Sequence, residues 1–150
     1  MRRNPARRRS PLPKFPSLEW FDTAADVLNK SDSSHRLGTC DTDMGVQVGD
    51  EYFLVPFDAF EVRPSRRIDA AIAGELDFTL VQSPEQWKAM IEDIQLNGHA
   101  THDFTLNSLD LHTETELAIG KDYVKRDAFY RFNQTLQEYF DTAAKFETTY

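Results

Sequence analysis

Apolar residues spaced three and four apart along the chain predict three main helices. The first follows Ser17, whose side chain can cap it, and ends in the polar cluster at 29–34. The second follows Ser83, because Ser-Pro-Glu-Gln combines an N-cap, a proline at the first helical position and the glutamine of a capping box. The third is long and runs from about Asp122 to Phe146 along one apolar face.

Alternating or continuous apolar runs predict the strands. Residues 46–48 and 52–57 flank Gly49-Asp50 and are typical of two strands joined by a tight turn. Both faces of the second run are apolar, so we expect this strand to be covered on both sides. Further strands are predicted at 60–64, 76–80 and 116–119, with one or two more within 95–113 and a short helix at 68–73. The pattern favours an α+β fold.

A length of 150 residues is typical of one domain. We divide the chain into a flexible basic arm, 1–15, and a single folded domain, 16–150. The arm holds six of the 17 basic residues and none of the 25 acidic ones, so the body carries 11 basic against 25 acidic residues. An acidic body repels phosphate backbones, which argues against nucleic acid as its partner. The arm is either a solvated tail or an electrostatic arm for RNA or for peripheral contact with anionic lipid headgroups of a membrane.

The chain offers few signals for compartment or assembly. Cys40 is the one cysteine, so no disulfide forms within the chain and a reducing compartment is expected. No apolar run approaches the roughly 18 residues of a membrane-spanning helix, and no apolar segment follows the basic start as in a secretory signal. We therefore expect a cytoplasmic protein, while its oligomeric state stays open.

Residues 77–87 join an apolar strand to the Ser-Pro cap and a tryptophan, and Ile-Gly-Lys-Asp at 119–122 precedes the last helix. With the order of the elements, these stretches resemble the sterol carrier protein 2-type sterol-binding domain over roughly residues 17–146. The resemblance implies a curved, mostly antiparallel sheet of about five strands, covered by helices and enclosing an apolar tunnel. It also implies a sterol, fatty acid or acyl-CoA as ligand, and no cofactor. The chain departs from the family where 58–60 lacks a turn glycine and where 64–74 forms a longer insert.

An apolar ligand needs concave area more than polar groups at fixed spacing, so such a site leaves no motif. We expect non-catalytic binding or carriage of a lipid-like molecule. The predicted wall comprises Phe53, Val55 and Phe57 from the sheet, Trp87, Met90 and Ile91 from the capped helix, and Phe129, Phe132, Leu136 and Phe140 from the last helix. The other interpretation of the same residues is a solid core.

One polar cluster offers different chemistry. His99, His102 and Asp103, with His112 and Glu114 close in sequence, would suit a metal ion only if a helix brought them to one face. Gly98 and polar neighbours favour a loop with solvated histidines, and we predict no metal site. The alternative function is a small dehydratase or isomerase that uses an acid–base pair such as His102 and Asp103 in an apolar pocket.

Two further features complete the candidates. Asp41 and Asp43 follow Cys40 closely in sequence and would raise its thiol pKa, which argues against a nucleophile. The basic side chains at 63, 66 and 67 form a small patch, either solvated or suited to clamp an acidic headgroup or a CoA phosphate.

Overall fold

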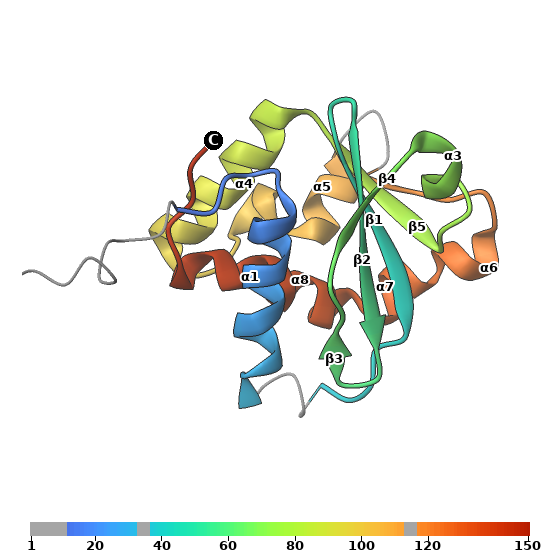
Figure 1. Ribbon diagram of the computed structural model, residues 1–150, viewed down its shortest axis with the longest axis horizontal. Coiled ribbons are helices and arrows are strands. Elements are labelled where there is room, and N and C mark those ends of the chain that lie inside the picture. Colours follow the sequence, from blue (N-terminus) through green and yellow to red (C-terminus); the bar gives the residue numbers. More distant parts are fainter. Residues whose placement is uncertain (1–11, 33–36, 113–116) are drawn as a thin grey trace, which may run out of the picture.

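A layer of helices packs against one face of an open mixed sheet, and a smaller helix lies on the other face (Figure 1). The computed structural model describes residues 12–32, 37–112 and 117–150. This arrangement confirms the α+β class. No helix within these residues has the length and apolar character needed to cross a membrane.

The sheet is built around one hairpin. β1 (Thr42–Val48) and β2 (Glu51–Asp58) pair antiparallel on either side of the predicted turn. The order across the sheet is β3-β2-β1-β5-β6, and β4 also pairs with β2. The remaining strands are β3 (Glu61–Val62), β4 (Arg66–Ile68), β5 (Phe78–Gln82) and β6 (Ala118–Ile119). Only β1 and β5 run parallel among these pairs, so the sheet is mostly antiparallel, as expected.

Local signals place the first two helices where the sequence predicts them. α1 (Leu18–Asn29) begins at Ser17, whose hydroxyl accepts the Trp20 backbone N–H at 3.1 Å. α4 (Pro84–Asn97) begins at Ser83 with both hydrogen bonds of the capping box, and ends at Gly98 with a φ of 85°. Because each signal lies within four residues of the helix end, no distant contact is needed to set it.

The prediction of strands within 95–113 is wrong. The segment forms a short 3₁₀ turn, η2 (His102–Phe104), and helix α5 (Leu106–His112). Leu106 and Asp110 are buried one helical turn apart, whereas Leu111 is 80 % exposed. Its buried positions therefore follow a helical period, but a segment of seven residues is too short for that period to be recognised.

The predicted helix at 122–146 is present as consecutive short segments, not as one straight helix. They are α6 (Tyr123–Arg126), α7 (Ala128–Arg131), α8 (Asn133–Asp141) and the 3₁₀ turn η3 (Thr142–Lys145). Backbone hydrogen bonds bridge the breaks, for example from Arg131 N–H to the Asp127 carbonyl at 3.0 Å. Val124, expected on the buried face, is 79 % exposed, so the segment bends away from the core at its start.

The insert between β3 and β5 contains a strand, β4, that the sequence pattern does not predict. Arg66–Ile68 forms β4 on the edge of β2, and the predicted helix is reduced to α3 (Ala70–Ala73). The Asp69 carboxylate caps α3 by accepting the Ile72 N–H at 2.8 Å. The insert therefore extends the sheet and then crosses over its outer surface.

The two ends of the described chain lie together. The Phe15 N–H donates to the Thr149 carbonyl at 2.8 Å, and the Thr149 N–H donates to Pro13 at 2.9 Å. Phe15 is only 4 % exposed. Residues 12–15 thus belong to the folded body, which moves the boundary of the predicted arm. Residues 1–11 of that arm lie outside the described residues.

Side chains alternate between the two faces of the sheet, as strand geometry requires. Val46, Phe53 and Leu80 point to the helical face, where each is fully buried against α1, α4 and the C-terminal segments. Gln47, Tyr52 and Val81 point to the outer face and are half-buried. The outer face of β2 is partly covered, because Leu54 is only 5 % exposed.

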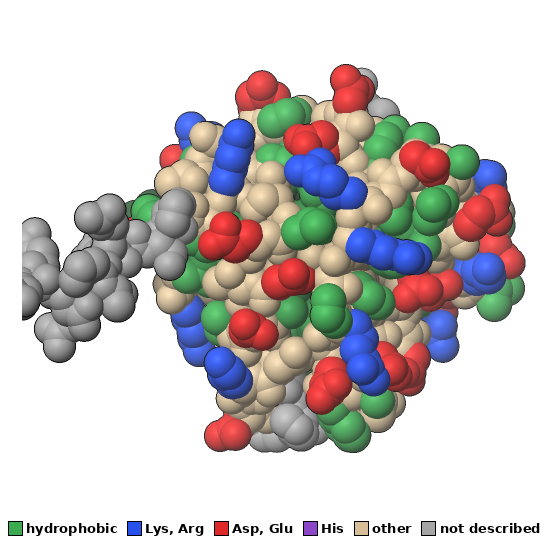
Figure 2. Space-filling view, viewed as in Figure 1, with side chains coloured by type: hydrophobic (Ala, Val, Ile, Leu, Met, Phe, Trp, Pro, Cys, Tyr) green, Lys and Arg blue, Asp and Glu red, His purple; other side chains and the backbone are tan. Residues whose placement is uncertain are grey.

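Charged side chains of both signs are interspersed over the face seen in Figure 2. Exposed ion pairs among the described residues include Arg63 with Asp58 at 3.1 Å. This face therefore presents no uniformly basic surface of the kind that a nucleic acid binds.

Candidate functional site

The residues predicted as a tunnel wall come together on the helical face. Nine of them are buried members of one core cluster, and Phe132 packs against it partly buried. Their rings are in contact: the Trp87 and Phe140 centroids are 5.4 Å apart, and Phe129 lies 5.6 Å from Phe78. The described part of the chain has at least four pockets, and among these four only the one of about 10 Å³ touches any of the ten residues, at Phe57.

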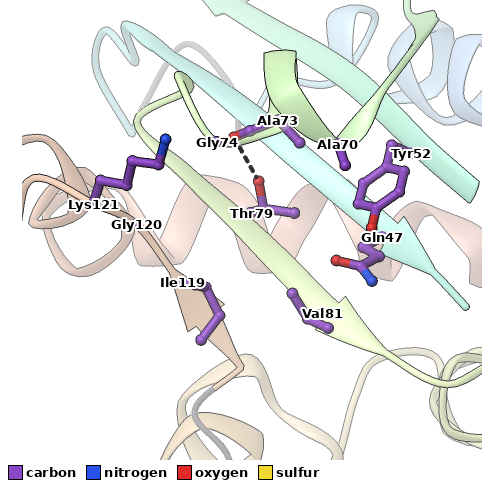
Figure 3. A pocket seen from close by; sticks show the side chains of 10 residues that line it. All are labelled: Gln47, Tyr52, Ala70, Ala73, Gly74, Thr79, Val81, Ile119, Gly120 and Lys121. Atoms are coloured by element: carbon purple, nitrogen blue, oxygen red, sulfur yellow. Dashed lines mark hydrogen bonds between the residues drawn. The ribbon is translucent and has the colours of Figure 1, made fainter. Parts of the chain in front are cut away.

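A larger hollow lies on the opposite face of the sheet. It has a volume of about 280 Å³ and is bounded by β1, β2, β5, α3 and β6 (Figure 3). We call it the outer recess. Its lining residues are Gln47, Tyr52, Ala70, Ala73, Gly74, Thr79, Val81, Ile119, Gly120 and Lys121.

The register of the strands assembles the floor of the outer recess. Gln47 lies opposite Tyr52 on β2 and opposite Val81 on β5, which forms one row across three strands. In the next row Thr79 lies opposite Gly45 and Ile119. Both rows point to the outer face because they are an even number of residues apart on each strand.

Small residues keep the outer recess open. α3 presents Ala70 and Ala73 to it, and Gly74 and Gly120 add no side chain. The Thr79 hydroxyl donates to the Ala73 carbonyl at 3.3 Å, which fixes α3 over the sheet (Figure 3). A helix with large side chains here would fill the same space, so the hollow depends on composition as well as on topology.

Few polar groups reach the outer recess. The Gln47 amide is used by its own turn, since Nε2 donates to the Gly49 carbonyl at 3.0 Å. Lys121 supplies the one charge among the described lining residues, and its Nζ lies 3.4 Å from Glu75 Oε1 in an exposed ion pair. These lining residues include no carboxylate, histidine or cysteine, and their polar side chains are those of Gln47, Tyr52, Thr79 and Lys121.

No family model, curated protein or solved structure matches this chain. The assignment of roles to individual residues therefore depends on the geometry described here.

The histidines predicted as an acid–base or metal cluster lie apart from the outer recess. His102 and Asp103 are exposed and line none of the four pockets. The His112 side chain and Glu114 lie outside the described residues. Within residues 12–32, 37–112 and 117–150, no three His, Cys, Asp or Glu side chains gather as metal ligands would.

His99 lies near a carboxylate that sequence reasoning missed. His99 and Asp141 line one pocket of about 230 Å³ together with Glu138 and Lys145. Burial raises the pKa of Asp141, while hydrogen bonds from the Ala100 N–H and the Gln137 amide and the nearby His99 oppose that shift. No local signal could have revealed this site, because Asp141 lies 41 residues from its backbone partner.

Cys40 behaves as the sequence predicts. Its side chain is 2 % exposed, and burial, followed by the charge of Asp41, raises the pKa of the thiol to about 12. The thiol is therefore protonated and inaccessible near neutral pH, which makes it a core residue.

The basic patch is paired with acids on the protein surface. Arg63 lies 3.1 Å from Asp58, and Arg67 lies 2.9 Å from Glu51 and stacks over the Phe53 ring at 4.9 Å. None of the three arginines is among the described residues that line the outer recess. Their use as a headgroup or phosphate clamp stays a prediction.

Proposed function

We propose that this chain binds a small, largely apolar molecule without changing it chemically, and that the outer recess is its site. The observation that carries the proposal is the outer recess itself, an open hollow of about 280 Å³ with a sheet for its floor and no acid–base pair among its described lining residues. The resemblance to the sterol carrier protein 2-type domain supports the same class of function.

The size of the hollow sets the ligand class and the affinity. Ligand sites are commonly about 300–1,000 Å³. At about 280 Å³ the outer recess lies just below that range, so it suits a small ligand. A molecule that buries about 200 Å² of apolar surface gains about 5 kcal/mol of transfer free energy. Association costs several kcal/mol of this gain. Binding should therefore be weak and readily reversible, as a carrier requires.

In this proposal the ten residues of the predicted wall form the structural core. Nine of them are buried in one cluster, where the Trp87 ring contacts Phe140 and the Phe129 ring contacts Phe78, so a ligand among them would have to separate α4 and the C-terminal segments from the sheet. A tunnel at that position remains the alternative site for the same ligand class. The two positions lie on opposite faces of the sheet, so substitutions can tell them apart.

We also propose a cytoplasmic location and peripheral membrane contact through the basic arm. The single cysteine supports a reducing compartment. Five arginines within residues 1–9 support attraction to anionic lipid.

The proposal is tested with N-phenyl-1-naphthylamine, a neutral apolar probe whose fluorescence rises when it leaves water. The native chain should bind it saturably with about one site. Val81→Glu places a carboxylate on the floor of the outer recess and should weaken binding at least tenfold, because an unpaired charge in an apolar site costs several kcal/mol. Val124→Glu makes the same change at a valine that is 79 % exposed and lines none of the four pockets, and it should bind like the native chain.

Thermal unfolding of each variant establishes that the fold is retained. Saturable binding that is equal in the native chain and in Val81→Glu would rule out the outer recess and leave the helical face as the site. Absence of saturable binding by the native chain would rule out the proposed function.

A further inference from the structure

The two ends of the outer recess differ in charge. Lys121 lies at one end, and Tyr52 and Gln47 lie at the other, with Val81 and Ile119 along the side between them (Figure 3). An apolar molecule along this axis would therefore have one end beside an ammonium group.

The position of the ammonium group depends on a glycine. A Cβ atom at Gly74 would lie 3.3 Å from both Cε and Nζ of Lys121, so the lysine side chain passes directly over this residue. The residue before Lys121 is Gly120, which fixes the course of the backbone here. A Cβ atom at Gly120 would come within 2.9 Å of the Asp77 carbonyl. The Lys121 side chain therefore lies at the rim of the outer recess, where most of its surface is exposed.

The present partner of Lys121 is easily exchanged. Its ion pair with Glu75 measures 3.4 Å, and the two side chains are 75 % and 77 % exposed. Such exposed pairs contribute little stability. An anionic group on a bound ligand can therefore compete with Glu75 for the ammonium.

We infer that the ligand of the outer recess is a monoanionic amphiphile, a molecule with an apolar body and one carboxylate, sulfonate or similar group that contacts Lys121. This inference rests on the proposed function. The formal net charge of −8 and the neighbouring Glu75 disfavour molecules that carry several negative charges. Because Lys121 is the one cation among the described lining residues, we expect the site to favour a ligand with one negative charge.

A matched pair of probes tests the inference. 8-Anilino-1-naphthalenesulfonate and N-phenyl-1-naphthylamine share one ring skeleton and differ by a sulfonate. The native chain should bind the sulfonate about two- to fivefold more tightly than the neutral probe, as expected for one exposed ion pair. Lys121→Gln should abolish this preference and leave the affinity for the neutral probe within twofold. Lys125→Gln, on α6 and outside the outer recess, is the control and should keep the preference.

Glu75→Gln adds an independent measurement, because removal of the competing carboxylate should raise the affinity for the sulfonate probe about twofold. The inference is overturned if both probes bind equally to the native chain, or if Lys121→Gln keeps the preference. In either case the proposed function stands, since the neutral probe still binds and still responds to Val81→Glu. Failure of both probes to bind would overturn the proposed function together with the inference.

Discussion

The parallel pairing of β1 with β5 can be tested at a single glycine. Gly45 lies opposite Thr79, and a Cβ atom added to it would fall well inside contact distance of the Thr79 hydroxyl and 3.1 Å from Leu76 Cδ1. Thr79 cannot simply turn away, because it is buried and its hydroxyl donates to the Ala73 carbonyl. Gly45→Ala should therefore push β1, β5 and α3 apart.

The expected loss of stability follows from two opposing effects. Overpacking of a well-packed site costs about 1–3 kcal/mol. Replacing glycine restricts the unfolded chain and returns about 0.4–1 kcal/mol. We expect a net loss of about 1–2 kcal/mol, which lowers the Tm of a domain of this size by about 2–8 °C.

The measurement is the urea-unfolding midpoint of Gly45→Ala beside Gly74→Ala. At Gly74 the φ is −66° and the nearest atoms to a Cβ belong to the flexible end of Lys121, so this control should stay within about 1 kcal/mol of the native chain. Thr79→Ala should reduce the effect of Gly45→Ala in the double variant, because it removes the hydroxyl that obstructs the new methyl group. If Gly45→Ala is as stable as the native chain, the register of β1 and β5 described here is wrong, and with it the floor of the outer recess.

Two further predictions concern the contact near the ends of the chain and the half-buried Asp141. Thr148→Val removes the acceptor of the Trp20 indole N–H, now 2.9 Å away, and should cost about 1–2 kcal/mol in urea unfolding, whereas Thr149→Val at an exposed position should cost less than half of that. Burial raises the pKa of Asp141 above its ordinary value of 3.8, so the folded chain holds this proton more tightly than the unfolded chain does. The native chain should therefore lose stability relative to Asp141→Asn as the pH rises from about 4 through that raised pKa, and a difference in unfolding midpoints that is constant between pH 4 and 7 would contradict this assignment.

The sequence by itself determined the elements whose signals are local. Ser17 and Ser83 start their helices through hydrogen bonds to residues three positions ahead, and Gly98 ends α4 in a left-handed conformation. The hairpin of β1 and β2 follows from two apolar runs and a two-residue turn. The α+β class followed from the same patterns, because the period of the apolar residues depends on the type of element and not on which distant element covers it.

Elements too short for a full period could not be recognised in this way. α5 spans seven residues, and leucines at 106, 109 and 111, spaced three and two apart, do not distinguish a strand from a helix over that length. The C-terminal apolar stripe predicted one helix, but the chain must also keep Arg126 against β6, where its Nε donates to the Ala118 carbonyl at 2.9 Å. That contact accompanies the bend at the start of the stripe and the exposure of Val124.

The candidate site was decided by the tertiary structure alone. The outer recess exists because β1 and β5 lie side by side although about thirty residues separate them, and because α3 crosses over their outer face. Its lining of alanine, glycine, threonine and valine carries no sequence signal, since such residues are common in any sheet or short helix. Apolar periodicity identifies core residues, but it does not predict a hollow. A hollow is defined by side chains that are absent and by neighbours that only the folded chain brings together.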